Sequence, residues 1–136
     1  MEQEAAQRLV AEAAREVRRG ASAEGTSGSH VVTLVNAILD TALAEDATDI
    51  HLEPMGGRLR IRMRVDGLLR ERPIQFPTAL APVIIARLKV MAGLDTAKRN
   101  RPQDGQIRYR MGERSIDMRV AVLPVVDGER MVVRIM

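Results

Sequence analysis

The 136-residue sequence predicts an α+β fold, in which helices cover one face of an antiparallel sheet of about six strands in the order α-βββ-α-βββ. Three observations support this prediction. Apolar residues recur at helical spacing in residues 31 to 43 and 78 to 93, and polar and apolar residues alternate in six other segments. Short turn dipeptides such as Asp-Gly and Gly-Glu separate several of these segments, which is typical of antiparallel hairpins.

The amino-terminal part differs in composition from the rest of the chain. Residues 2 to 19 are rich in helix formers but carry only a thin apolar stripe, made of Leu9, Ala13 and Val17. Residues 20 to 29 collect Gly, Ser, Ala and Thr without periodicity, as flexible linkers do. We therefore expect residues 1 to 29 to be a flexible or helical lead-in, poorly ordered, and residues 30 to 136 to form the domain.

The domain is expected to begin with a helix and a three-stranded meander. The helix runs from Val31 to Leu43, where the apolar spacing is closest to ideal. Residues 48 to 54, 58 to 65 and 68 to 74 follow as strands, and the Asp66-Gly67 pair predicts a tight hairpin between the last two.

A second helix and a second meander complete the prediction. Thr78 is placed to cap a helix that ends at Gly93, with Leu80, Ile84, Leu88 and Met91 on its apolar side. A polar loop follows through about residue 106, with Asp104-Gly105 as a turn. The remaining alternating segments are Gln106 to Met111, Arg114 to Leu123 and Arg130 to Met136.

Arginine occupies every second position in the second predicted strand. The period of two places these side chains on one sheet face, opposite the apolar residues between them; they are Arg58, Arg60, Arg62 and Arg64. From residue 58 to residue 110 the chain has thirteen Arg or Lys against four Asp or Glu. Such a patch predicts an anionic partner, and the guanidinium fork suits phosphate or carboxylate oxygens. For any single arginine, a solvated sheet face is the simpler interpretation.

Several classes of site are excluded by composition. The chain has no cysteine, so it has no disulfide framework, thiol nucleophile or cysteine-rich zinc site. It contains no Gly-Lys pair, so it has no Walker A phosphate loop, and no Gly-x-Ser-x-Gly motif. No segment is long and apolar enough to span a bilayer and the first residues do not resemble a signal peptide, so we expect a soluble, intracellular protein.

His51 is flanked by two carboxylates on one predicted strand face. Asp49, His51 and Glu53 could hold a metal ion or perform acid–base chemistry, or they could form a hydrogen-bonded polar cluster. Two carboxylates and one imidazole on a single strand seldom make a complete ligand set, which favours the polar cluster and no metal.

Five motifs in order resemble a known family. They are "ATDIHLEP", "LRIRMRVDGLLRE", "RLKVMAGLD", "RPQDGQI" and "GERMVVRIM", within residues 30 to 136. Together they resemble the domain that precedes the nucleotide-binding domain in the ATPases of type II secretion, type IV pilus assembly and competence. The resemblance implies a PAS-like fold and a chain that is the non-catalytic portion of a motor. This chain therefore would not hydrolyse ATP alone.

The resemblance also implies a mechanism and partners. In the complete hexameric motor this domain closes on its own carboxy-terminal nucleotide-binding domain and contacts neighbouring subunits. Its arginines then reach the phosphates of ATP, which the full-length protein binds with Mg²⁺. The motor is cytoplasmic and associates with inner-membrane secretion or pilus platform proteins. Which of these systems the parent serves is left open.

The motif match implies which residues contact phosphate. Arg62 and Arg64 match the arginines of the family's "R-F-R-x-D-G" motif, with Met63 in place of the aromatic residue, and Arg70 matches a further basic position. A supporting role is expected for Asp66, Arg99, Arg101 and Asp104. Asn100 stands where the family commonly has arginine, and Thr48 replaces the usual serine.

Two other functions fit parts of the sequence. A free-standing nucleic-acid-binding module would use the basic sheet, although one Phe, one Tyr and no Trp leave almost no surface for stacking bases. A duplex-phosphate binder does not need such stacking. A small-molecule sensor is the third possibility, because PAS-like sheets elsewhere hold ligands.

Overall fold

The computed structural model describes residues 3 to 19 and 29 to 136. None of the helices in these ranges has the length and hydrophobicity of a membrane-spanning segment. The helices are α1 (Gln3–Arg18), α2 (His30–Ala44), the short 3-10 helix η1 (Thr78–Leu80) and α3 (Ala81–Met91). The strands are β1 (Asp49–Met55), β2 (Arg58–Val65), β3 (Leu68–Glu71), β4 (Gln103–Met111), β5 (Arg114–Val125) and β6 (Gly128–Ile135).

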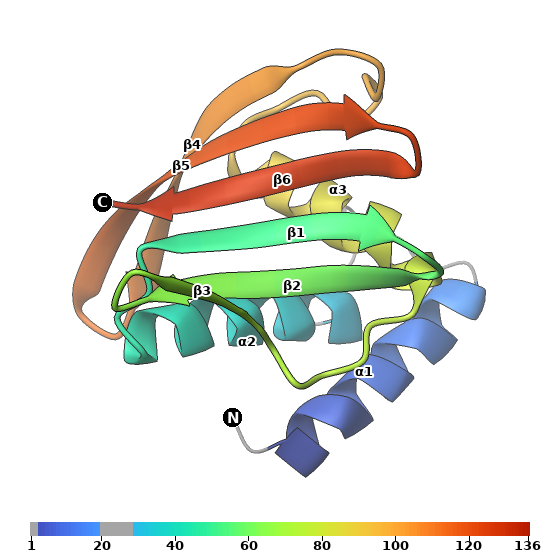
Figure 1. Ribbon diagram of the computed structural model, residues 1–136, viewed down its shortest axis with the longest axis horizontal. Helices are drawn as coiled ribbons and strands as arrows, with labels where there is room; N and C mark the ends of the chain where they lie inside the picture. Colours follow the sequence, from blue (N-terminus) through green and yellow to red (C-terminus); the bar gives the residue numbers. More distant parts are fainter. Residues whose placement is uncertain (1–2, 20–28) are drawn as a thin grey trace.

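One six-stranded antiparallel sheet organises the molecule, in the order β3-β2-β1-β6-β5-β4 (Figure 1). Strands β1 to β3 form one meander and strands β4 to β6 form the other. The two meanders join where β1 pairs with β6, with Ile50 opposite Val133. The predicted α+β class and the α-βββ-α-βββ order are therefore confirmed for residues 30 to 136.

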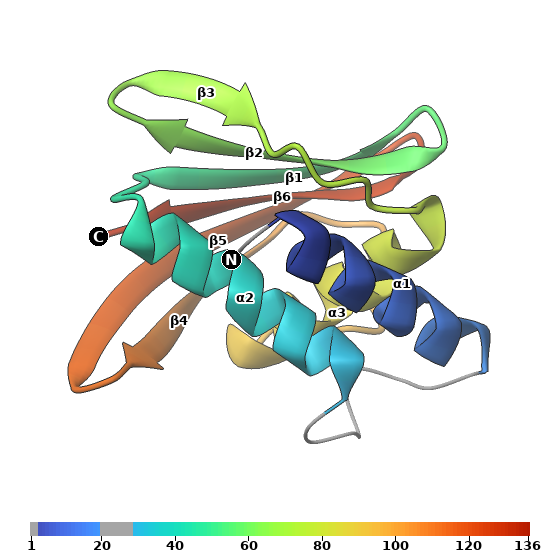
Figure 2. The ribbon, with the colours of Figure 1, turned by 90° about the horizontal axis from the view of Figure 1, so that it is seen from below.

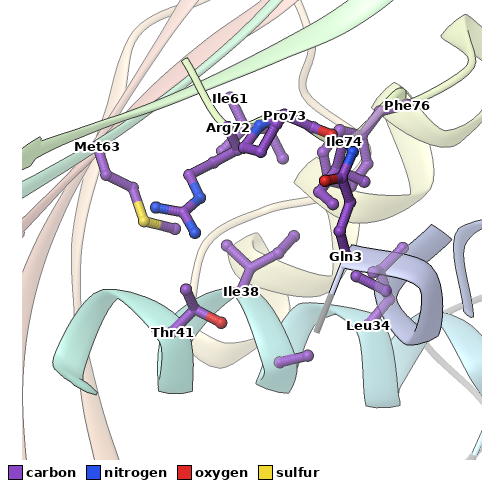
Figure 3. Close-up of a pocket in the computed structure, with 12 residues that line it drawn as sticks. Gln3, Leu34, Ile38, Thr41, Ile61, Met63, Arg72, Pro73, Ile74 and Phe76 are labelled. Atoms are coloured by element: carbon purple, nitrogen blue, oxygen red, sulfur yellow. Dashed lines mark hydrogen bonds between the residues drawn. The ribbon is translucent and has the colours of Figure 1, made fainter. Parts of the chain in front are cut away.

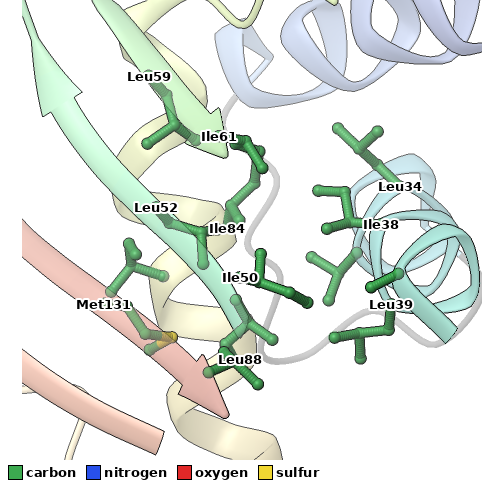
Figure 4. Close-up of a cluster of buried hydrophobic side chains, with 14 of the residues drawn as sticks. Leu34, Ile38, Leu39, Ile50, Leu52, Leu59, Ile61, Ile84, Leu88 and Met131 are labelled. Atoms are coloured by element: carbon green, nitrogen blue, oxygen red, sulfur yellow. The ribbon is translucent and has the colours of Figure 1, made fainter. Parts of the chain in front are cut away.

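The helices α1, α2 and α3 lie on the same face of the sheet, and none of the described residues forms a helix on the other face (Figure 2). The core between the layers is aliphatic, since the chain has only one Phe and one Tyr. Figure 4 shows α2 and α3 side chains pointing at the sheet residues Ile50, Leu52, Ile61 and Met131, all at most 1% exposed. The helix side is therefore the apolar side of β1 and β2.

Helix α1 packs more firmly than the sequence predicts. Its buried positions are Ala6, Val10, Ala13 and Ala14, so the apolar side is rotated from the predicted stripe. The amide of Gln7 donates to the carbonyl of Gln75 at 3.0 Å. Small side chains let α1 approach α2 closely, which hydropathy alone does not reveal. The predicted linker lies outside the described residues, except Ser29.

Two helix starts differ from the prediction. Ser29 caps α2, because its hydroxyl accepts a hydrogen bond from the Val32 amide at 3.1 Å. Thr78 does not cap a long helix. It begins the 3-10 turn η1, and α3 starts after Leu80 without a side-chain cap. Pro82 lies in the first turn of α3, where a missing amide is tolerated.

Strand β4 starts earlier than predicted, and the turn predicted at Asp104-Gly105 is wrong. Both residues lie in β4, where they pair with Ala121 and Val120. A Cβ on Gly105 would stand 2.7 Å from the carbonyl oxygen of Ala92, so the glycine permits β4 to pass close to the end of α3. At the other edge, β3 ends at Glu71 rather than residue 74.

Candidate functional site

The arginines of β2 lie together on the helix-free face. Burial alternates along the strand, with Leu59, Ile61 and Met63 buried on the helix side. The arginines between them are half-buried on the open side, as the period of two predicts. Arg62 and Arg64 have side chains 28% and 38% exposed, so a partner that covers this face can reach them.

Two carboxylates of β1 hold these arginines. Glu53 accepts a hydrogen bond from Arg60 at 2.5 Å and lies 3.6 Å from the nearest guanidinium nitrogen of Arg62. Asp49 lies 3.6 Å from Arg64 and 3.3 Å from Arg134 of β6. A carboxylate beside an arginine limits the orientations of the guanidinium group. The arginines are therefore directed along the sheet by their neighbours on adjacent strands.

The hydroxyl of Thr48 donates to Asp49 at 2.8 Å. Threonine and serine supply the same donor, so the replacement of the family's serine preserves this contact. Asp49 is buried, which makes its hydrogen bond and ion pairs necessary to offset the cost of burying a charge.

The charges on this face shift the pKa values of two groups. The hydrogen bond from Arg60 lowers the pKa of the Glu53 carboxyl below its usual range. Burial lowers the pKa of the His51 imidazole, and the positive charge of Arg62 lowers it further. His51 is therefore mainly neutral at pH 7. Asp49 and Glu53 bond to arginines of the neighbouring strands rather than to His51. Within the described residues, no group of three His, Cys, Asp or Glu side chains is placed to hold a metal ion.

The hairpin after β2 orients Arg64 by its backbone. Asp66 and Gly67 both have positive φ, 51° and 80°, as a tight two-residue turn requires. Arg64 donates to the carbonyl oxygen of Gly67 at 3.0 Å. Among the ion pairs between described residues, none involves Asp66. In this structure Asp66 contributes the first of the two positive φ values of the turn.

Arg70 lies on the other face of the sheet. It pairs with Met63, whose side chain points to the helices, whereas Arg62 and Arg64 pair with Glu71 and Leu69. Because directly paired residues share a face, the structure does not bring Arg70 beside the other two arginines. Arg70 is exposed near the sheet edge.

The remaining predicted residues lie elsewhere. Arg99 and Arg101 are exposed in the loop before β4, and Arg99 lines a hollow with Pro54. Pro54 is near the opposite end of β1 from Asp49, so the loop arginines are at the other end of the strand from Arg64. Asp104 lies on the open face of β4, beside a hollow that Arg119 and Arg134 line.

Sequence reasoning missed the contribution of β6. Arg134 meets Asp49 only because β6 lies beside β1, more than eighty residues away in the chain. Alternation in "GERMVVRIM" places Arg130 and Arg134 on one face of their strand. The contact between Arg134 and Asp49 could have been predicted only with the order of the strands in the sheet.

An apolar cavity lies on the helix side, between α1, α2, β2 and the segment after β3 (Figure 3). Its volume of about 90 Å³ is well below the roughly 300 to 1,000 Å³ of small-molecule sites. Leu34, Ile38 and Phe76 line it, and Arg72 stands at its edge, paired with Glu45 at 2.8 Å. The cavity gives no support to the sensor alternative.

Comparisons with known proteins identify relatives. The family model described as type II/IV secretion system protein matches residues 24 to 136. Type II secretion system protein E of Pseudomonas aeruginosa is 48% identical over 106 residues, which is 78% of this chain and 21% of that protein. Type II secretion system ATPase E of Vibrio cholerae is 43% identical, over 83% of this chain and 22% of its own length. The chain thus spans about a fifth of these relatives.

Two solved structures share the fold. The pilus retraction motor PilT, solved with ADP, matches with a TM-score of 0.51 and 17% identity, over 71% of this chain and 27% of that chain. The Legionella pneumophila ATPase DotB matches with a TM-score of 0.52 and 14% identity, over 76% of this chain and 28% of that chain. These matches extend the similarity in fold beyond the relatives found by sequence.

Proposed function

The chain belongs to the type II/IV secretion system protein family, and we propose that it is a non-catalytic domain of a secretion or pilus ATPase. In this proposal the open sheet face closes on a nucleotide-binding domain within a hexamer. Arg62 and Arg64 then contact the phosphates of ATP, which is bound with Mg²⁺ by the other domain. The complete motor works beside platform proteins at the inner membrane and couples hydrolysis to secretion or pilus assembly.

The observation that supports this proposal most directly is the state of Arg62. Among the described residues its guanidinium has one carboxylate contact, at 3.6 Å to Glu53, which already receives the shorter bond from Arg60. The long contact leaves donors of Arg62 for an incoming anion. An arginine that reaches the phosphates only in the closed state stabilises charge that develops during transfer, so domain closure and chemistry are coupled.

Arg70 has a separate role in the proposal. Its position on the helix side of β3 excludes it from a cluster with Arg62 and Arg64 on a single subunit's open face. We therefore assign Arg62 and Arg64 the primary phosphate contact and Arg70 a contact with a partner approaching the sheet edge.

The test is ATP turnover in a polypeptide that joins this domain to its nucleotide-binding domain. Arg62→Ala and Arg64→Ala are compared with Arg108→Ala, which removes an arginine of β4 at the far edge of the same face. We expect Arg62→Ala and Arg64→Ala to lower kcat at least about tenfold while ATP affinity is largely kept. Loss of an arginine finger in other phosphoryl-transfer enzymes lowers kcat by about 10³-fold or more. Equal turnover in all three variants would contradict the proposal.

Binding to duplex nucleic acid is the second candidate. It is favoured by Arg110, Arg119 and Arg130, for which the described residues provide no carboxylate within ion-pair distance. If the basic face binds a phosphate backbone, affinity for random-sequence DNA will fall steeply as salt rises. This candidate would be favoured if Arg119→Ala and Arg130→Ala weaken a salt-sensitive binding to DNA and if Arg62→Ala and Arg64→Ala leave ATP turnover unchanged.

A further inference from the structure

Lys89 of α3 is the most buried charged residue of the described chain. Its side chain is 1% exposed, although an ammonium group is costly to remove from water unless it is paired. Its Nζ atom lies 2.6 Å from a carboxylate oxygen of Glu129 on β6, whose side chain is 9% exposed. The same Nζ donates to the backbone carbonyl of Lys98 at 2.9 Å. The buried charge thus connects a helix, a strand and a loop.

Gln103, the first residue of β4, holds the same loop from the other side. Its side-chain amide donates to the carbonyls of Asp95 and Lys98, both at 3.0 Å. Its amide oxygen accepts from the Asp95 backbone N–H, also at 3.0 Å. The carbonyl of Lys98 therefore receives two side-chain donors, from Lys89 and from Gln103. Contacts of this kind fix a backbone that has no strand or helix of its own.

The loop ends are also held. The amide of Leu94 donates to the backbone carbonyl of Lys89 at 2.8 Å, directly after α3. At the other end, Gly105 allows β4 to lie against the end of the helix. The loop, residues 94 to 102, is thus anchored at both ends and at its middle carbonyl.

The loop presents cations outward while its backbone is fixed inward. Lys98, Arg99 and Arg101 are exposed within four residues, and Arg99 borders the hollow that also contains Lys89 and Glu129. Long side chains lose much conformational entropy when an anion orders them. A fixed backbone reduces the part of this cost that comes from ordering the loop itself.

We propose that Lys89 is a positioning residue, which with Glu129 and Gln103 holds the loop of residues 94 to 102 so that Arg99 and Arg101 meet the phosphates of an ATP bound at a neighbouring subunit, a site other than the one that Arg62 and Arg64 reach from the open face. The phosphate part rests on the proposed function. Buried ion pairs contribute little to stability compared with apolar residues of similar volume, so the pair serves the conformation of the loop rather than the stability of the domain.

The first measurement is hydrogen exchange of the loop in this chain. Lys89→Met with Glu129→Gln removes both charges at nearly constant volume, and Arg8→Met removes an exposed cation of α1 as a control. We expect the double variant to keep a thermal midpoint close to that of the unaltered chain. Amides of residues 95 to 98 are expected to exchange at least about tenfold faster, because they lose an anchor of their backbone. Unchanged exchange in a folded double variant would overturn the proposal.

A second variant covers the case in which the double variant does not fold. Gln103→Met removes the other donor to the Lys98 carbonyl without burying or exposing a charge. It is expected to accelerate exchange of the same amides while the core strands stay protected. Protection of the loop equal to that of the unaltered chain would again overturn the proposal.

ATP turnover of the joined polypeptide tests the phosphate part. We expect the Lys89→Met, Glu129→Gln variant to lose as much kcat/KM as the combined Arg99→Ala, Arg101→Ala variant. Combining all four changes should add little, because residues that act as a unit are not additive. A faster-exchanging loop with unchanged turnover would overturn the phosphate part. The Arg62 and Arg64 variants test the proposed function separately. A failure of the proposed function can therefore be distinguished from a failure of the proposed role of Lys89.

Discussion

The two faces of the sheet are held by different forces. On the helix side, β1 contributes Ile50 and Leu52, which are fully buried among aliphatic side chains. On the open side, the same strand contributes Asp49 and Glu53, which contact arginines at distances from 2.5 to 3.6 Å. Packing supplies most of the stability, whereas the charge network orients groups that remain partly exposed. The proposed closure on an anion would use both faces, because one stays packed while the arginines of the other change partners.

The largest loss of stability is expected from a substitution that creates a cavity in the core on the helix side. Leu52→Ala removes apolar contacts at the centre of the sheet, and the free energy of unfolding should fall by about 3 kcal/mol. Denaturant unfolding measures this difference. Val126→Ala, at a fully exposed turn, is the control and should change stability by less than about 0.5 kcal/mol. Similar losses in both variants would contradict the division between the faces.

An added methyl group at Gly105 should have the next largest effect. The new Cβ would stand 2.7 Å from the Ala92 carbonyl oxygen, so either β4 or the end of α3 has to move. We expect Gly105→Ala to lower the free energy of unfolding by about 2 kcal/mol. Thermal unfolding checks the value, and a variant as stable as the unaltered chain would show that the two elements separate easily.

On the open face, Glu53→Gln should cost about 1 kcal/mol at pH 7, since it removes an ion pair but keeps the shape. The folded state lowers the pKa of Glu53 from 4.5, so this carboxylate stabilises the fold above that pH and the contribution disappears as pH falls through the folded value. The variant should therefore lose less stability than the unaltered chain when acidified below about pH 4.5. Parallel unfolding curves at pH 7 and pH 3 test this. Identical acid sensitivity would assign the slope to other carboxylates.

The smallest effect is expected at the edge of the same face. Arg108 pairs with Asp117 at 3.1 Å, but the two side chains are 71% and 44% exposed. Arg108→Ala should change the free energy of unfolding by less than about 0.5 kcal/mol. If Arg108→Ala lowers the free energy of unfolding as much as Glu53→Gln does, then solvent exposure does not determine how much these ion pairs contribute to stability.

Local pattern predicted much of this arrangement. The alternation in residues 58 to 65 placed four arginines on one face, and the structure has β2 over those residues with that face open. The Asp66-Gly67 pair predicted a hairpin, because few residues adopt two successive positive φ values. Period and turn chemistry act within a few residues, so they can be recognised without the fold.

Local pattern misled where tertiary contacts override it. Asp104-Gly105 has the composition of a turn, yet the glycine serves a close approach to α3. Helix α1 has a weak stripe of large apolar residues, yet its alanines are buried against the domain. The family motif brought Arg70 into the same prediction as Arg62, although strand register places them on opposite faces.

Residue spacing and motif order were enough to predict most of the helices and strands, the apolar and cationic sides of β2, and the family. They could not predict that β6 lies beside β1, that Asp49 therefore meets both Arg64 and Arg134, or that Lys89 is buried against Glu129. The physical reason is distance along the chain. Strand order and the burial of a charge depend on contacts between segments that are tens of residues apart, and no local period records them.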